Sequence, residues 1–200
     1  MKQNVVTLDL EGVLVPEIWI AVAESMGIEA LRRTTRDEPD YDVLMRYRLN
    51  ILNEHNLKLA DIQTVIGGLS PLPGAREFLD GLRAHTQVII LSDTFLQFAE
   101  PLMRQLGWPT LFCNHLEVVE GRVVDYHLRQ PDQKRQSVIA LKSLNYTIIS
   151  AGDSYNDTTM LAEADHGILF RAPENVKAEF PQFPALEEYK DLMAEMEKHL

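Results

Sequence analysis

Two apolar, β-branched stretches far apart in the chain both stop abruptly at carboxylates and glycine. The first reads VVTLDLEGV over residues 5–13, and the second reads IISAGDSYND over residues 148–157. Buried parallel strands have this composition, and in an open α/β sheet the ligand crevice lies just outside their carboxyl ends. We therefore expect four acids to share one crevice: Asp9, Glu11, Asp153 and Asp157. Clustered carboxylates repel one another unless a cation offsets them, and a hard, oxygen-preferring ion such as Mg²⁺ is the leading candidate.

Composition excludes several other classes of protein. The 200 residues are 46% hydrophobic with a net charge of −11, which fits one or two globular domains and argues against a nucleic-acid partner. No apolar run is long enough to span a membrane, and the N-terminus lacks a signal pattern. The lone Cys113 cannot form an internal disulfide and is expected in the core. These features predict a cytoplasmic protein, and the scattered histidines argue against zinc.

Strand and helix patterns alternate along most of the chain, which predicts an α/β fold with a doubly wound parallel sheet. Two further short strands, Leu116–Val119 and Val123–His127, flank Glu120-Gly121-Arg122 and are expected to form a hairpin at the sheet margin. The strands expected in the main sheet are Val5–Asp9, Val88–Ser92, Thr110–Cys113, Thr147–Ala151 and Gly167–Phe170.

The stretch from Leu14 to Ser70 has a different pattern, because it contains helical signals and no strand candidate. It ends at Pro71-Leu72-Pro73-Gly74, a stop signal followed by a new helix. Near the C-terminus, an amphipathic helix is expected to cover the core with one apolar stripe, made of Leu186, Tyr189, Leu192, Met193 and Met196.

Four motifs in order resemble those of the haloacid dehalogenase (HAD) phosphohydrolase superfamily. They are Asp-Leu-Glu-Gly-Val after the first strand, Ser92 at the end of an apolar strand, Lys134 before a helical stretch, and Gly-Asp-Ser-Tyr-Asn-Asp late in the chain. Acids at strand ends alone are common helix caps, so the ordered set carries the resemblance. It implies an HAD-like Rossmannoid core at residues 1–14 and 71–200 with an inserted helical cap at residues 15–70, as in the phosphoserine phosphatase branch.

The resemblance also implies roles for the acids. Asp9 would be the nucleophile that forms an aspartyl-phosphate, and Glu11 the general acid and base. A Mg²⁺ ion would be held by Asp9, the backbone carbonyl of Glu11 and Asp153, while Asp157 would orient these ligands.

Other residues are expected to hold the substrate phosphate. Ser92 and Asp93 follow a strand, where a hydroxyl and backbone N–H groups at a helix start would bind an anion, although Ser92 could equally be a plain helix cap. Lys134 would offset phosphoryl charge, with Arg135 next to it as the competitor. Asn156 either caps the following helix or contacts the phosphate.

The predicted cap contains a candidate clamp for an amino acid. Arg48 shares a helix face with apolar Leu44, Ile51 and Leu52, so its guanidinium is directed inward and suits a carboxylate. Glu17 is either a favourable acid at a helix N-terminus or a partner for a substrate ammonium. By resemblance to phosphoserine phosphatases, the two would bind a small phosphorylated amino acid.

Glu11 departs from the superfamily, which more commonly has Asp at this position. Asp-Leu-Glu-Gly occurs in a small branch of bifunctional phosphoserine phosphatase/homoserine phosphotransferases, and the resemblance to that branch extends along nearly the whole chain. The sequence thus predicts Mg²⁺-dependent hydrolysis of O-phosphoserine, with possible transfer to homoserine. The alternatives are a phosphatase for another small metabolite and a phospho-aspartate signalling module without turnover. The oligomeric state stays open.

Overall fold

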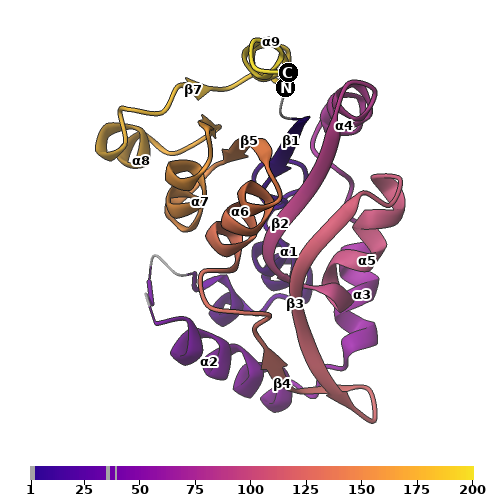
Figure 1. The fold of residues 1–200 in the computed structure, drawn as a ribbon. Coiled ribbons are helices and arrows are strands. Elements are labelled where there is room, and N and C mark those ends of the chain that lie inside the picture. The colour runs from indigo at the N-terminus through magenta and orange to yellow at the C-terminus, as the bar shows by residue number, and fades with distance from the viewer. Residues whose placement is uncertain (1–2, 35–36, 39) are drawn as a thin grey trace.

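The computed structural model describes residues 3–34, 37–38 and 40–200. A seven-stranded sheet in the order β4-β3-β2-β1-β5-β6-β7 runs through the molecule, and β1 occupies its centre (Figure 1). All neighbouring strands are parallel except β3 and β4, which form an antiparallel hairpin at one margin. The strands are β1 (Gln3–Leu8), β2 (Gln87–Phe95), β3 (Thr110–Val119), β4 (Arg122–His127), β5 (Tyr146–Gly152), β6 (His166–Phe170) and β7 (Ala185–Leu186).

Helices follow most strands and cover both faces of the sheet. The α-helices are α1 (Ile18–Met26), α2 (Tyr41–Glu54), α3 (Leu59–Gly67), α4 (Ala75–Arg83), α5 (Leu96–Gln105), α6 (Gln133–Ser143), α7 (Thr158–Glu163), α8 (Glu174–Glu179) and α9 (Tyr189–Glu197). Two short 3₁₀ turns are η1 (Glu29–Arg32) and η2 (Tyr155–Asp157).

Alternate residues of each central strand pack on opposite faces of the sheet, as the two-residue strand period requires. Val6 and Leu8 of β1 belong to a large core that also contains side chains of α1 to α5 and α9. Val5 belongs to a second, smaller core with side chains of α6, α7 and α8. The strands are therefore apolar on both faces, which leaves their carboxyl ends as the place for polar groups.

Local sequence explains where the helices next to those ends begin and stop. The Asp40 carboxylate accepts hydrogen bonds from the Asp42 and Val43 N–H groups, 3.0 and 3.2 Å away, and so caps α2. α1 stops at Gly27, whose φ of 66° lies in the left-handed region that glycine adopts without strain. The Asp40 cap fixes the start of α2, the helix that carries Arg48.

The predicted α/β fold and the marginal hairpin are confirmed, and within residues 14–34, 37–38 and 40–70 the only regular elements are helical. Three local predictions are wrong. Thr110–Cys113 and Leu116–Val119 form one continuous strand, β3, because the chain between them stays paired. β2 continues past Ser92 to Phe95, so α5 begins at Leu96. Leu186 lies in β7, whereas the helix with buried Leu192 and Met196 begins at Tyr189.

The division into a core (residues 1–14 and 71–200) and a cap (15–70) stays a prediction. Leu14 and Leu72 lie side by side, since the Leu72 N–H donates to the Leu14 carbonyl over 2.9 Å. The chain therefore leaves and re-enters the sheet region at neighbouring points. Among the described residues, no helix is long and apolar enough to cross a membrane.

Candidate active site

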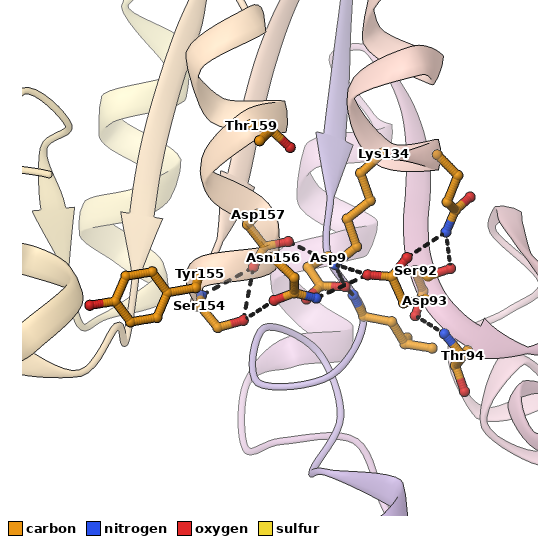
Figure 2. Close-up of polar contacts among 12 residues, drawn as sticks. Asp9, Ser92, Asp93, Thr94, Lys134, Ser154, Tyr155, Asn156, Asp157 and Thr159 are labelled. Carbon is orange, nitrogen blue, oxygen red and sulfur yellow. Dashed lines mark hydrogen bonds and ion pairs between the residues drawn. The ribbon is translucent and has the colours of Figure 1, made fainter. Parts of the chain in front are cut away.

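A buried lysine lies among carboxylates at the carboxyl end of β1. The Lys134 ammonium is 2.9 Å from Asp9 Oδ1 and 2.7 Å from Asp157 Oδ1, and the residue is 2% exposed (Figure 2). Burial by itself lowers the pKa of Lys134, but the carboxylates of Asp157 and Asp9 more than offset this and hold the pKa well above its ordinary value. Arg135, its competitor from the sequence, instead pairs with Glu163 at an exposed position. Of these two neighbours, Lys134 is the cation that the fold directs into the site.

Asp153 and Asp157 reach the same point from the end of β5. Both oxygens of Asp157 are already bonded: Oδ1 to the Lys134 ammonium, and Oδ2 to the N–H groups of Asp153 and Ser154 at 3.0 and 3.1 Å. Asp157 therefore braces the loop and the lysine. The Asp153 carboxylate lies against Gly12, where a Cβ would come within 2.5 Å of it, and Gly12 has a φ of 76°. A glycine at position 12 thus lets the two acidic segments approach each other.

Three of these acids form a set suited to a divalent cation. Asp9, Asp153 and Asp157 each offer an oxygen within 4.8 Å of the others. Burial and then repulsion from Asp157 raise the pKa of Asp153 to about 7, and the same two effects raise the pKa of Asp9 against the opposing charge of Lys134. A hard cation with oxygen ligands would relieve that repulsion. Asp9 and Asp153 are the better ligands, since the oxygens of Asp157 are occupied.

Ser92 and Asp93 face the acids from the neighbouring strand, yet not from a helix start as expected. Because β2 continues to Phe95, neither helix capping nor a helix N-terminus explains Ser92, whose hydroxyl oxygen instead accepts from the Thr94 N–H over 3.2 Å. The Asp93 carboxylate accepts from the side-chain amides of Asn156 at 3.0 Å and Gln133 at 3.1 Å. Burial raises the pKa of Asp93, but Lys134 and these two amides outweigh it, so the pKa is lowered and the group is an anion.

Asn156 is bound on both sides and does not cap α7, which follows Asp157. Its amide nitrogen donates to Asp93, and its oxygen accepts from the Ser154 hydroxyl. Figure 2 shows the resulting line of contacts from the β5 loop to the end of β2. Asn156 therefore lies in the group that the sequence expected around a phosphate.

Glu11 and Glu17 stand on the α1 side of the crevice. The Glu11 carboxylate accepts the Ile18 N–H over 2.9 Å and so satisfies a free N–H at the start of α1. Burial, followed by repulsion from Glu17, raises the pKa of Glu11 to about 8. A carboxylic acid with such a pKa is largely protonated at neutral pH and is suited to donate a proton.

Arg48 is directed inward, as its apolar neighbours on α2 predict, and is only 6% exposed. Its guanidinium stacks 4.6 Å above the Trp19 ring and donates to the Arg33 carbonyl over 2.8 Å. The buried Nε has no hydrogen-bond partner, and no described residue forms an ion pair with the side chain. Burial lowers the pKa of Arg48 to about 10, partly offset by Tyr41, so the group is still a cation at neutral pH. It is a desolvated positive charge with a donor to spare.

All of the predicted site residues except Asp157 line one cavity of about 320 Å³. Asp9 and Asp153 line it from the carboxyl ends of β1 and β5, and Lys134 lines it from α6. Glu17 contributes from the position before α1, and Arg48 contributes from α2. The lining thus combines a buried cation and metal-ligating acids with a further acid and an arginine, which suits a small molecule that carries both anionic and cationic groups.

The family model for haloacid dehalogenase-like hydrolases matches residues 4–165. The chain belongs to this hydrolase family. It is 67% identical over 196 residues to "Phosphoserine phosphatase ThrH" of Pseudomonas aeruginosa, which covers 98% of this chain and 96% of that protein. It is also 67% identical to "Phosphoserine phosphatase" of Pseudomonas syringae pv. tomato, with 98% and 83% covered.

A solved structure shares the fold of this hydrolase. "Phospho-Aspartyl Intermediate Analogue of Phosphoserine phosphatase" superposes with a TM-score of 0.75 at 19% identity, over 93% of each chain. At this identity the likeness establishes the fold alone.

Sequence reasoning missed several residues around the hydrolase site. Trp19 and Tyr41 line the cavity, whereas Gln133 does not line it but donates a hydrogen bond to the Asp93 carboxylate. Gln133 directly precedes Lys134 at the start of α6, and that adjacency was the only signal available. In the sequence, Trp19 and Tyr41 have the pattern of core aromatic residues, because a local pattern does not distinguish a residue in a cavity wall from one in a packed interior.

Proposed function

We propose that this hydrolase removes phosphate from O-phosphoserine through an aspartyl-phosphate on Asp9. The observation that carries the proposal is that one cavity is lined both by Asp9 and Lys134 and by Glu17 and Arg48. The names of the two Pseudomonas relatives support the substrate, since both are called phosphoserine phosphatases.

Asp9 is proposed to attack the phosphorus in line, because a carboxylate can form an acyl phosphate and divide the reaction into two easier steps. Lys134 lies 2.9 Å from Asp9 and would stabilise negative charge on the equatorial phosphoryl oxygens. A Mg²⁺ ion would be held by Asp9, Asp153 and the backbone carbonyl of Glu11, and would supply further charge neutralisation. Asp157 keeps the lysine and the Asp153 loop in place through three hydrogen bonds.

Glu11 is proposed to protonate the departing serine hydroxyl and then to take a proton from the attacking water. Its pKa of about 8 supplies the acid form needed for the first step. Its hydrogen bond to the Ile18 N–H holds the carboxyl group at the cavity wall. Without such an acid, an alkoxide would have to leave, which is costly near neutral pH.

Arg48 and Glu17 are proposed to bind the α-carboxylate and the α-ammonium of the substrate. The free donor on Arg48 Nε would gain a partner, and Glu17 lies exposed at the cavity wall without a side-chain hydrogen bond to the start of α1. Ser92, the Asp93 backbone and Asn156 would contact the phosphate. The Asp93 carboxylate itself is an anion and would repel it.

We also propose that the phosphoenzyme can pass its phosphate to homoserine. The base that activates water can equally activate an alcohol bound where serine departs, because this attack is the reverse of leaving-group loss. A clamp from Glu17 and Arg48 would raise the local concentration of a hydroxyl amino acid over that of water. The cytoplasmic location that the sequence predicts stays a prediction.

The test is a phosphate-release assay with Mg²⁺ across phosphoserine, sugar phosphates and nucleotides, followed by phosphoserine turnover with added homoserine. We expect phosphoserine to be the best substrate and phosphohomoserine to form. A preference for another phosphate ester would move the function to a different metabolite. Free phosphate as the sole product at saturating homoserine would remove the transfer step and leave a phosphatase. A single phosphorylation of Asp9 without turnover would instead indicate a signalling module.

A further inference from the structure

The end of β2 contains a segment, Ser92–Thr94, that is held by side chains from two other elements, α6 and β3. The Gln133 amide nitrogen donates to the Ser92 carbonyl and to Asp93 Oδ1, the latter over 3.1 Å. From β3, the Asn114 side chain donates to the Asp93 carbonyl over 3.0 Å. The carbonyls of Ser92 and Asp93 and the Asp93 carboxylate are therefore all held by side chains that come from outside the segment.

Gln133 is buried in this position, and its side chain is fixed by further hydrogen bonds. It is 3% exposed, and its amide oxygen accepts from Arg129 Nη2 at 3.0 Å and Nε at 3.3 Å. Arg129 is in turn held by the Ser137 hydroxyl at 2.6 Å and stacks on Phe112 at 5.1 Å. Only this orientation of the amide matches donors with acceptors, because a flipped Gln133 would direct its oxygen at two other oxygens and its nitrogen at a guanidinium.

These contacts bear on the repulsion expected between the Asp93 carboxylate and a bound phosphate. Asp93 is an anion next to the place where a phosphate dianion is expected, and an unrestrained carboxylate there would oppose binding. Gln133 holds one carboxylate oxygen and Asn156 the other, 3.0 Å away, while Lys134 stands 3.7 Å from the group. In this position the Asp93 carboxylate holds Asn156 by a hydrogen bond and Lys134 by an ion pair. The Ser92 hydroxyl and the backbone of the segment remain available to a ligand in the cavity.

We propose that Gln133, supported by Arg129, is a positioning residue for phosphate binding: it fixes the Ser92–Thr94 segment and the Asp93 carboxylate so that Ser92, Asn156 and Lys134 meet the phosphoryl group. This inference rests on the proposed phosphate chemistry at Asp9, but not on phosphoserine being the substrate. Nothing in the local sequence marks Gln133 apart from its place before Lys134.

The experiment compares Gln133→Leu with Gln136→Leu, an exposed glutamine on the same helix. Each is assayed with phosphoserine and with p-nitrophenyl phosphate, and each is titrated with inorganic phosphate as an inhibitor. For Gln133→Leu we expect kcat/KM to fall about 10- to 100-fold on both substrates, as outer-shell contacts typically contribute, with weaker phosphate inhibition. Gln136→Leu should match the wild type. Equal losses on both substrates identify a defect at the phosphate, whereas a defect in an amino-acid clamp would spare p-nitrophenyl phosphate.

Gln133→Glu is the second variant, since it keeps the size and the contact with Arg129 but directs a carboxylate at Asp93. We expect it to be at least as impaired as Gln133→Leu while unfolding near the wild-type temperature. Arg129→Met should give a smaller loss that disappears in the Gln133→Leu background, because its effect passes through Gln133.

Wild-type kinetics and phosphate inhibition in a folded Gln133→Leu or Gln133→Glu protein would overturn the proposal. Additive losses in the Arg129→Met/Gln133→Leu double variant would overturn the role of Arg129. A wild-type enzyme that hydrolyses p-nitrophenyl phosphate but not phosphoserine would refute the proposed substrate and leave the test of Gln133 intact.

Discussion

Replacing Arg48 by Met should separate substrate recognition from stability. Methionine is also long and unbranched, so it can fill the space over Trp19 without the guanidinium. The substrate pair is phosphoserine and phosphoethanolamine, which lacks only the α-carboxylate. If Arg48 binds that carboxylate, the variant should lose activity on the first substrate and keep it on the second.

The size of the loss follows from the burial of the guanidinium. Truncating one partner of a buried, hydrogen-bonded charge pair costs about 2–4 kcal/mol, which corresponds to a ~30- to 1,000-fold decrease in kcat/KM for phosphoserine. Phosphoethanolamine turnover should change less than about 3-fold, because this substrate has no carboxylate for Arg48 to bind.

The free energy of unfolding should respond differently, because burying the unpartnered Nε of Arg48 destabilises the protein without substrate. Removing the unpartnered Nε should gain about 1–3 kcal/mol, which offsets the lost hydrogen bond to Arg33 and the lost stacking on Trp19, each about 1–2 kcal/mol. The free energy of unfolding in urea should therefore stay within about 1 kcal/mol of the wild type. A large drop in stability, with equal losses on both substrates, would show that Arg48 is structural and refute this reasoning.

Three further outcomes are expected. Asp9→Asn should abolish phosphate release while leaving the circular dichroism spectrum unchanged, because an amide is a poor nucleophile; residual turnover near wild type would exclude an aspartyl-phosphate there. Gly12→Ala should cost about 1–2 kcal/mol of backbone strain, as should Gly27→Ala, where a Cβ meets nothing within 4 Å. Only the former should raise the Mg²⁺ concentration for half-maximal activity, because its Cβ displaces Asp153; equal Mg²⁺ curves would contradict the metal assignment. Burial, then the imidazole stacked on it, lowers the pKa of His166, so the unfolded chain binds more protons below about pH 6.5. Stability should fall as pH drops through that value and fall less in His166→Gln, which urea unfolding at pH 7.5 and 5.5 will measure.

The acids of the site were predictable from sequence because strand ends are local features. Asp9 and Asp153 follow apolar, β-branched runs that are typical of buried parallel strands, and parallel strands bring their carboxyl ends to one edge of the sheet. Lys134 could not be separated from Arg135 locally, since neighbours on a helix differ only in which way they face. The fold decides this by directing Lys134 at Asp157 and Arg135 at Glu163.

Other features depended on contacts that no local pattern records. β2 reads as ending at Ser92, yet it continues to Phe95 because β3 offers a partner at Asn114 after an irregular register. Gln133 has the composition of an ordinary polar residue at a helix start, and only the closed fold places Asp93 beside it. Such residues become visible once the strands are paired.

The central position of β1 has a consequence for how the protein is made. β1 is synthesised before the other strands of the sheet, and its Thr7 hydroxyl pairs with the Ser150 hydroxyl, 143 positions later in the chain, over 2.6 Å. At a synthesis rate of roughly 5–20 residues per second, an apolar segment waits on the order of 10–30 s for that neighbour. The helices that follow β1 can form in the meantime, whereas Asp9 meets Asp153 and Asp157 only after β5 and the loop that follows it have been synthesised. A nascent or prematurely terminated chain that stops before β5 is therefore expected to be inactive and in need of a chaperone.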